Sequence, residues 1–234
     1  MTRDRVIVFG IVGVLVVLAI SRHVLTFTSG TALFLLVLIP SVILHEVAHG
    51  VAALACGDDT AQRAGRLTLN PVRHVDLFGT LLLPALLAVT GHSVFGYAKP
   101  VPVNPTQLRH PRNQSVLVSL AGPATNIALA AIAALWLRQE HLAFLSTASG
   151  PWRNRILVAL GVTNVFLAVF NLIPIPPLDG SSVITRVLPK DWEQGWATLQ
   201  RYGMFIVLGV VLLEPQALSR LFDPALRLWV RLLQ

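Results

Sequence analysis

The sequence predicts an all-α polytopic membrane protein with about five to six hydrophobic segments, one of them re-entrant, and short β-strand-like loops. The chain has 234 residues, of which 54% are hydrophobic and 12% are charged. Soluble domains carry about 25% charged residues, so this composition indicates a chain that lies in lipid. The mean hydropathy is +0.69. We therefore expect a single integral-membrane domain over residues 1–234, without a separate soluble module.

The charge is strongly basic, but its distribution argues against nucleic acid. The formal net charge is +7, and the basic residues lie at the ends of apolar runs. There they set the orientation of the spans and meet anionic lipid headgroups. No stretch interleaves a basic patch with aromatic side chains, so we expect a lipid bilayer and no nucleic acid as partner. Cys56 is the only cysteine, which excludes an internal disulfide.

Three hydrophobic segments are predicted in the first half of the chain. Residues 6–20 are apolar between flanking arginines and predict a first span that is retained as an anchor. Residues 31–55 predict a second span, with Pro40 expected to kink it. Residues 77–90 reach only about 21 Å as a helix, short of the roughly 30 Å hydrocarbon core, and they contain Pro84. They therefore favour a re-entrant segment.

Three further hydrophobic segments and an amphipathic helix follow. Residues 116–137 predict a span, and residues 156–180 predict another whose end is unwound by its prolines. Residues 203–213 form the centre of a short last span, after a short helix and loop at 181–200. Residues 217–233 alternate leucines with arginines, as in an interfacial amphipathic helix. The β-strand-like stretches are Arg66–Leu69, Val94–Tyr97 and Val101–Val103.

The residues with the clearest chemistry lie inside the second span. His45 and His49 are four residues apart, so both imidazoles project from one face of a helix and can bind one metal ion. Glu46 points about 100° away, where it can hold a water beside that metal. The alternative is a pair of core histidines satisfied by neighbours. Ionisable groups at this depth in lipid are costly, which favours the metal site.

A catalytic zinc has three protein ligands and an open position, and Asp179 is the strongest candidate for the third ligand. It follows a proline-rich stretch at the end of a span, where non-helical backbone can line a cavity. A surface turn is the alternative, because Leu-Asp-Gly also suits turns. Asp179 and His49 reach the same side only if residues 77–90 are re-entrant. Both then lie towards the cytoplasmic face, where most basic residues fall.

These motifs together resemble the site-2 protease family of intramembrane zinc metalloproteases. His45 to His49 match its H-E-x-x-H, Asn171 to Gly180 match N-x-x-P-x-P-x-L-D-G, and Gly122 to Asn126 match G-P-x-x-N. Two loop stretches resemble the compact bacterial subgroup, which has no PDZ or CBS appendage. The resemblance implies one catalytic Zn²⁺ held by His45, His49 and Asp179, with Glu46 as catalytic acid/base.

Several other residues are candidates for substrate-binding or structural roles. Asn126 and Asn171 are polar groups in apolar spans. Each is a candidate to hold a substrate backbone, to orient the unwound stretch or to form a hydrogen bond between helices. Three roles are considered for His74 and Asp76: binding a second metal, orienting the first metal, or capping the re-entrant segment. A substrate helix must unwind before cleavage, and residues 94–103 can then pair with it by edge addition. The candidate clamp residues are Tyr97, Lys99, Pro100 and Val101.

The expected function is hydrolysis of peptide bonds in or near transmembrane segments of protein or peptide substrates. The resemblance to the bacterial subgroup further implies a bacterial plasma membrane, and the distribution of basic residues predicts an active site towards the cytoplasm. Two other classes remain open: a membrane metal-ion carrier, which would not need Glu46, and a non-cleaving relative that binds transmembrane helices. The oligomeric state and the substrate are not encoded in any motif.

Overall fold

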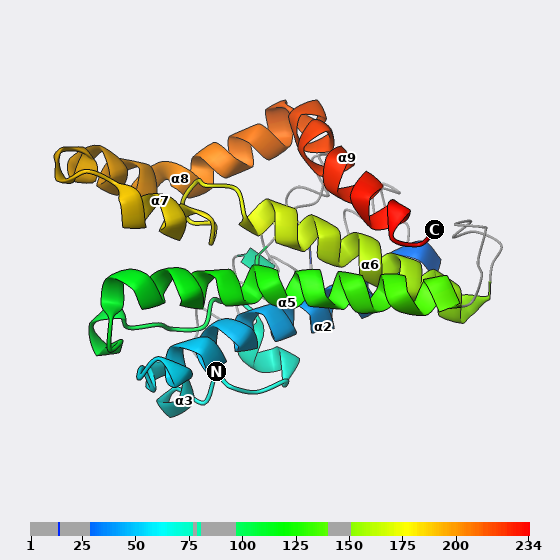
Figure 1. Cartoon of the computed structure of the whole chain (residues 1–234), viewed down its shortest axis with the longest axis horizontal. Helices are drawn as coiled ribbons and strands as arrows, with labels where there is room; N and C mark the ends of the chain where they lie inside the picture. Colours follow the sequence, from blue (N-terminus) through cyan, green and yellow to red (C-terminus); the bar gives the residue numbers. More distant parts are fainter. Residues whose placement is uncertain (1–13, 15–28, 77–78, 81–96, 140–150) are drawn as a thin grey trace. The chain divides into compact units, whose positions relative to one another are not determined.

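A computed structural model describes residues 14, 29–76, 79–80, 97–139 and 151–234. Every regular element in this part of the chain is a helix (Figure 1). The α-helices are α2 (Ser29–Ala55), α3 (Thr60–Arg63), α5 (Pro111–Gln139), α6 (Trp152–Asn171), α7 (Ser181–Val187), α8 (Glu193–Leu213) and α9 (Pro215–Arg231). The 3-10 turns are η1 (Pro71–His74), η3 (Pro105–Gln107) and η4 (Lys190–Trp192).

Contacts divide the chain into two compact units. The first contains Met1–Ala32 and Asn70–Pro100, and the second contains Leu33–Leu69 and Val101–Gln234. The predicted first span at 6–20 and the predicted re-entrant segment at 77–90 lie outside the described residues, apart from Val14, Gly79 and Thr80. The single-domain organisation and the re-entrant segment therefore stay predictions.

Among the described residues, three helices are long and apolar enough to cross a membrane: α2 over Ala32–Ala55, all of α5 and all of α6. They correspond to the predicted spans at 31–55, 116–137 and 156–180, which confirms a membrane protein that is helical throughout its described regular elements. Much of their apolar surface faces outward, as expected of helices that meet lipid. Examples of exposed apolar side chains are Leu36 and Val51 on α2, and Leu117, Ile127 and Leu135 on α5.

Helices α5 and α6 pack side by side, and α9 covers both (Figure 1). Small residues of α5, namely Ala130, Ala133 and Ala134, are fully buried against Val165 of α6 and Trp229 of α9. The Trp229 indole N–H donates to the carbonyl of Ala130 at 2.8 Å. Gly161 is needed here, because a Cβ at that position would come within 1.9 Å of the Trp229 ring.

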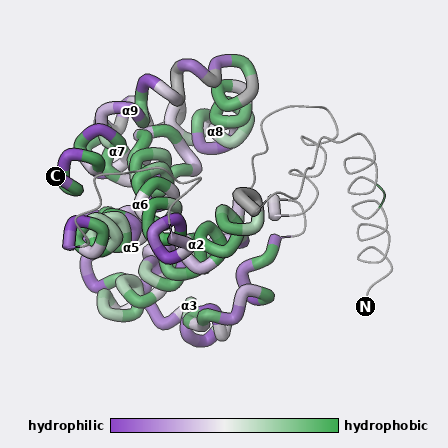
Figure 2. The backbone as a smooth tube through the Cα atoms, turned by 90° about the vertical axis from the view of Figure 1, so that its right-hand side faces the viewer, coloured by the Kyte–Doolittle hydropathy of each residue, from purple (hydrophilic) through white to green (hydrophobic). Residues whose placement is uncertain are grey.

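Helix α2 ends in a Schellman motif that leads into a polar connection. Gly57 adopts φ 109°, its N–H bonds to the carbonyl of Leu54, and the Asp58 N–H bonds to that of Ala53. The buried Asp58 carboxylate then accepts from the hydroxyl and N–H of Thr60 and the N–H of Asn104. Burial raises the pKa of Asp58, but these hydrogen bonds outweigh it and hold the pKa below its ordinary value. Figure 2 shows hydrophilic residues gathered around α3 and mostly hydrophobic residues along α6.

Two sequence predictions are wrong. Arg66–Leu69 and Val101–Val103 form no β-strand, whereas the predicted stretch Val94–Tyr97 lies outside the described residues apart from Tyr97. Prolines at 100, 102 and 105 cannot donate to a ladder, and neighbouring N–H groups bond to side chains instead. The second error lies at 193–200, predicted as part of a loop, where the chain is helical and continuous with the last apolar segment as α8.

Candidate metal centre

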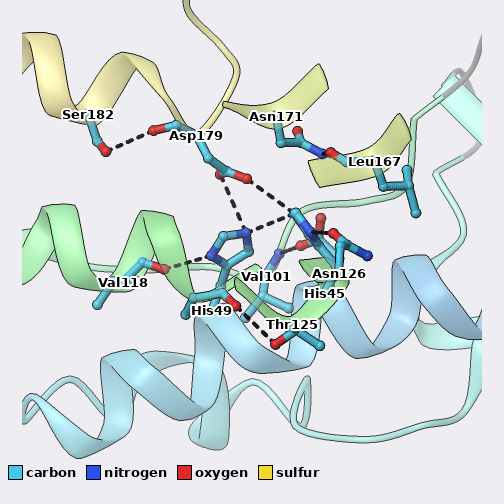
Figure 3. Close-up of polar contacts among 12 residues, drawn as sticks. His45, His49, Val101, Val118, Thr125, Asn126, Leu167, Asn171, Asp179 and Ser182 are labelled. Carbon is cyan, nitrogen blue, oxygen red and sulfur yellow. Dashed lines mark hydrogen bonds and ion pairs between the residues drawn. The ribbon is translucent and has the colours of Figure 1, made fainter. Parts of the chain in front are cut away.

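The three predicted metal ligands come together in the second unit. His45 and His49 lie one turn apart on α2, and their Nε2 atoms are 3.1 Å from each other. Asp179 reaches them from the segment after α6, with Oδ2 at 3.2 Å from His45 Nε2 and Oδ1 at 3.4 Å from His49 Nε2. All three ligand atoms lie within 4.8 Å of one another (Figure 3).

The hydrogen bond made by Nδ1 of each imidazole decides whether Nε2 of the same ring carries a lone pair. His49 Nδ1 lies 2.7 Å from the carbonyl oxygen of Val118, and His45 Nδ1 lies 2.6 Å from Asn126 Oδ1. Both partners are acceptors, so both Nδ1 atoms carry hydrogen and donate. In the neutral rings each Nε2 then presents a lone pair, which is the form that binds a metal.

The donor set fits a divalent cation. Two Nε2 lone pairs and a carboxylate converge, and Asp179 Oδ2 is buried without a hydrogen-bond partner among the described residues. Three acceptors this close together repel one another unless a cation lies between them. Gly122 of α5 provides the space, because a Cβ there would come within 2.4 Å of His49 Nε2 and 2.6 Å of His45 Nε2. Two imidazoles and a carboxylate with an open side are a ligand set that zinc enzymes use.

Asp179 is positioned by the end of α6. Prolines stop the helix, and Pro176 and Pro177 are joined by a cis peptide bond. The chain then folds back, with the Gly180 N–H donating to the carbonyl of Asn171 at 2.7 Å. Gly180 has no room for a Cβ, which would come within 2.2 Å of the Leu172 carbonyl oxygen. The Ser182 hydroxyl bonds to the Asp179 carbonyl as α7 begins.

Glu46 faces a different neighbour from the two histidines. One oxygen of its half-buried carboxylate accepts the N–H of Val101 at 2.8 Å. Gly50, one turn further along α2, allows the close approach of this segment, because a Cβ there would come within 3.0 Å of Val101. The segment from Val101 to Asn104 is thus held at both ends by carboxylates that flank the C-terminal half of α2, those of Glu46 and Asp58.

The remaining candidates are distributed over both units. Asn126 joins the metal centre, whereas the Asn171 amide donates to the carbonyl of Leu167 in its own helix. His74 and Asp76 belong to the first unit, where the Asp76 carboxylate accepts from the Gly79 N–H at 2.7 Å. Tyr97, Lys99 and Pro100 also belong to that unit. The N–H of Tyr97 donates to Gly79 and that of Lys99 to His74.

Sequence reasoning missed Asn164 and Ser41, two buried polar residues behind the metal centre. Asn126 Nδ2 donates to Asn164 Oδ1 at 2.8 Å, and Asn164 Nδ2 donates to the Ser41 hydroxyl oxygen at 2.9 Å. All three side chains are at most 1% exposed. A polar side chain in an apolar run was the available signal, and Asn164 lies in the middle of α6.

Comparison with known proteins supports the chemistry of this centre. The model of "Peptidase family M50" matches residues 33–149 and 146–211. Two relatives carry the name "Putative zinc metalloprotease". YwhC of Bacillus subtilis is 41% identical over 76% of this chain and 78% of its own length. Rip2 of Mycolicibacterium smegmatis is 35% identical over 78% of this chain and 66% of its own length.

Rip2 of Mycobacterium tuberculosis is 32% identical over 75% of this chain and 64% of its own length, so this chain spans just under two thirds of the Rip2 proteins. No solved structure matches the chain. The family match covers most of the chain, and the relatives' names agree with the His-His-Asp centre. The resemblance seen in the motifs is thereby confirmed: the chain belongs to peptidase family M50, the site-2 protease family, and is an integral-membrane zinc metalloprotease.

Proposed function

We propose that this protein hydrolyses peptide bonds in or near transmembrane segments of membrane proteins. The observation that carries the proposal is the convergence of His45, His49 and Asp179 beside a helix that is apolar enough to span a membrane. A cleavage centre on such a helix is within reach of substrates that lie in the bilayer. The proposed ligands of the zinc are these three residues.

In the proposed mechanism, bound zinc supplies a Lewis acid that polarises the scissile carbonyl and acidifies a water. Glu46 takes up the proton of the attacking water and passes it to the leaving amine. The Val101 N–H holds the Glu46 carboxylate in place, which limits the orientations that it can adopt. The carbonyl of Val118 and the amide of Asn126 keep the Nε2 lone pairs of the two histidines directed at the metal.

The segment Tyr97–Val103 is proposed to contact the unwound substrate. The contact of Val101 with Glu46 supports this role for the second half of the segment, although the Val101 N–H is already engaged by Glu46 and is not free to pair with substrate. Replacing Tyr97–Val103 by a Gly/Ser linker should raise the KM for a helical substrate. Unchanged cleavage of that substrate would exclude the clamp.

The central experiment is cleavage in a defined membrane. The purified protein is reconstituted into liposomes with a single-span substrate, and wild type is compared with Glu46→Gln and with wild type treated with a chelator. We expect cleavage by wild type only, with activity restored to the chelated sample by Zn²⁺. Cleavage by Glu46→Gln would overturn the mechanism. Zinc flux into the liposomes without cleavage would instead support a metal carrier.

The proposed location is the bacterial plasma membrane with the centre towards the cytoplasm. Two basic residues support this location. The main-chain N–H of Arg109 donates to the Cys56 carbonyl at the end of α2, and the side chain of Arg186 donates to the Asn113 side chain at the start of α5. These ends therefore lie together on one side and carry the positive charge expected of a cytoplasmic face.

Thiol labelling tests this orientation. The single cysteine, Cys56, lies at the relevant end of α2 and is half-buried, so an exposed Gln62→Cys in a Cys56→Ser background serves as a second site. A membrane-impermeant maleimide should label both in inside-out vesicles and neither in intact cells. Labelling in intact cells would place the centre on the opposite side.

A further inference from the structure

The two histidines differ in what holds their Nδ1 hydrogen. His49 donates directly to a main-chain carbonyl, that of Val118 on α5. His45 donates to a side-chain amide, Asn126, whose two ends are nearly alike in shape. An amide that turned over would present Nδ2 to His45 and favour hydrogen on Nε2, which would then have no lone pair for a metal. Something must therefore fix the direction of the Asn126 amide.

Asn164 provides that direction. Its Nδ2 donates to the main-chain carbonyl of Leu160 at 2.9 Å and to the Ser41 hydroxyl oxygen at 2.9 Å. A carbonyl oxygen only accepts, so the NH₂ end of Asn164 must face Leu160 and its Oδ1 must face Asn126. Asn126 then has to turn its Nδ2 towards Asn164, which leaves its Oδ1 for His45.

We propose that Asn126 and Asn164 are positioning residues that form a two-amide relay from the Leu160 carbonyl to His45. The relay keeps the His45 Nε2 lone pair directed at the metal, as the Val118 carbonyl does for His49. It joins α2, α5 and α6 through groups that are almost completely buried. The inference rests on the proposed function, because it takes His45 to be a zinc ligand.

A simpler role for these amides would be to hold three helices together. The two roles predict different measurements. A helix–helix bond contributes to thermal stability with or without metal, and its loss would leave the zinc affinity of the folded protein unchanged. A relay contributes to zinc affinity even in variants that remain fully folded. Partners behind metal ligands typically change metal affinity by about 10- to 100-fold when they are removed.

The test measures the zinc dissociation constant of the full chain in detergent, by competition with a chromophoric chelator, and the visible spectrum of the Co²⁺-loaded protein. Asn164→Leu should weaken zinc binding about 10- to 100-fold and change the Co²⁺ spectrum. Asn154→Leu is the matched control, because Asn154 is a buried amide of the same helix that takes no part in the relay. It should keep the wild-type affinity and spectrum.

A second variant separates the relay from simple misfolding. In Asn126→Asp both oxygens are acceptors, so His45 keeps its partner whichever way the group turns. Adding Asn164→Leu to this background should have little further effect on zinc affinity, although any damage to packing would remain. Equal losses from Asn164→Leu in both backgrounds would overturn the relay, as would a wild-type affinity in Asn164→Leu alone.

The same measurements distinguish failure of the relay from failure of the proposed function. If wild type binds zinc and cleaves its substrate while Asn164→Leu binds zinc equally well, only the relay is wrong. If His49→Ala and Asp179→Ala leave zinc binding unchanged, the ligand set itself is wrong, and the relay falls with it.

Discussion

His45 and His49 are one turn apart on the same helix, yet α5 supports them in different ways. Opposite His49, the main chain of α5 is close enough for the Val118 carbonyl to accept its Nδ1 hydrogen. Opposite His45, a side chain bridges the gap, that of Asn126. Val118, Gly122 and Asn126 follow each other at intervals of four and share one face of α5.

This difference shows where the centre is vulnerable to substitution. A main-chain carbonyl survives any change of side chain, so the support of His49 is built into the helix itself. The support of His45 depends on two amide side chains and on the order in which they donate. We therefore expect the relay side to respond strongly to single substitutions, and the carbonyl side to respond weakly.

The largest expected effect comes from a change that affects both histidines equally. In Gly122→Ala the new Cβ would lie within 2.4 Å of His49 Nε2 and 2.6 Å of His45 Nε2, in the space between the ligands. We expect loss of zinc binding by more than about 100-fold and loss of proteolysis, measured by chelator competition and liposome cleavage. Zinc binding at the wild-type level would show that the metal lies elsewhere.

The next effect separates the two histidines. Asn126→Leu removes the acceptor of His45 and should weaken zinc binding by about 10- to 100-fold. Val118→Ala truncates a buried side chain but keeps the carbonyl, so it should cost roughly 1–3 kcal/mol of stability with a much smaller change in zinc affinity. Thermal unfolding and zinc titration of both variants measure the contrast. Equal changes in zinc affinity would remove the distinction between the two supports.

A smaller effect, on kcat, is expected from a change in the surroundings of the Glu46 carboxylate on α2. Val101→Pro removes the N–H that Glu46 accepts. A hydrogen bond to a charged group contributes about 1.5–3 kcal/mol, so kcat should fall roughly tenfold or more while zinc affinity is unchanged. Val103→Pro, two residues away in the same proline-rich segment, leaves that bond intact and is the control. Similar kcat values for the two variants would exclude a role for the Val101 N–H.

The smallest effect concerns the polar end of α2. Because the folded-state pKa of Asp58 lies below its ordinary value of 3.8, its hydrogen bonds contribute stability that is present above that pH. The contribution is lost as the pH falls through the folded-state pKa. Hydrogen exchange of the Thr60 and Asn104 amides should therefore accelerate in strong acid only, and Asp58→Asn should remove this acid dependence. A change between pH 5 and 7 would argue against Asp58 as the cause.

The sequence was sufficient to predict the three long apolar helices and the convergence of His45, His49 and Asp179, because both follow from local patterns. Apolar runs require helices in lipid, and the spacing of His45 and His49 places them on one face. Asp179 could be added because few carboxylates lie in apolar surroundings. The length of α8 was underestimated because its first turns are polar. A polar helix and a polar loop have similar sequences, and only their packing distinguishes them.

The supports of the ligands were out of reach for a different reason. The Val118 carbonyl belongs to the main chain, so the residue type at position 118 does not indicate its role. Asn164 and Ser41 act through the register between three helices, and nothing in a single sequence gives that register. A single polar residue in an apolar span, such as Asn126, is predicted to need a hydrogen-bond partner. The sequence alone does not show which residue that partner is.

The close contact between α8 and the Asp179 segment has a consequence for biosynthesis. Gly203 lies so near Pro176 that a Cβ would come within 1.9 Å of its carbonyl oxygen, so α8 packs directly on the turn that carries the last ligand. Translation delivers His45, Glu46 and His49 to the membrane long before Asp179 and α8. A chain that ends before Asp179 therefore carries only two of the three proposed zinc ligands, His45 and His49. The proposed zinc site is therefore complete only once the chain has been synthesised beyond Asp179, and the turn that carries this ligand gains its contact with α8 later still.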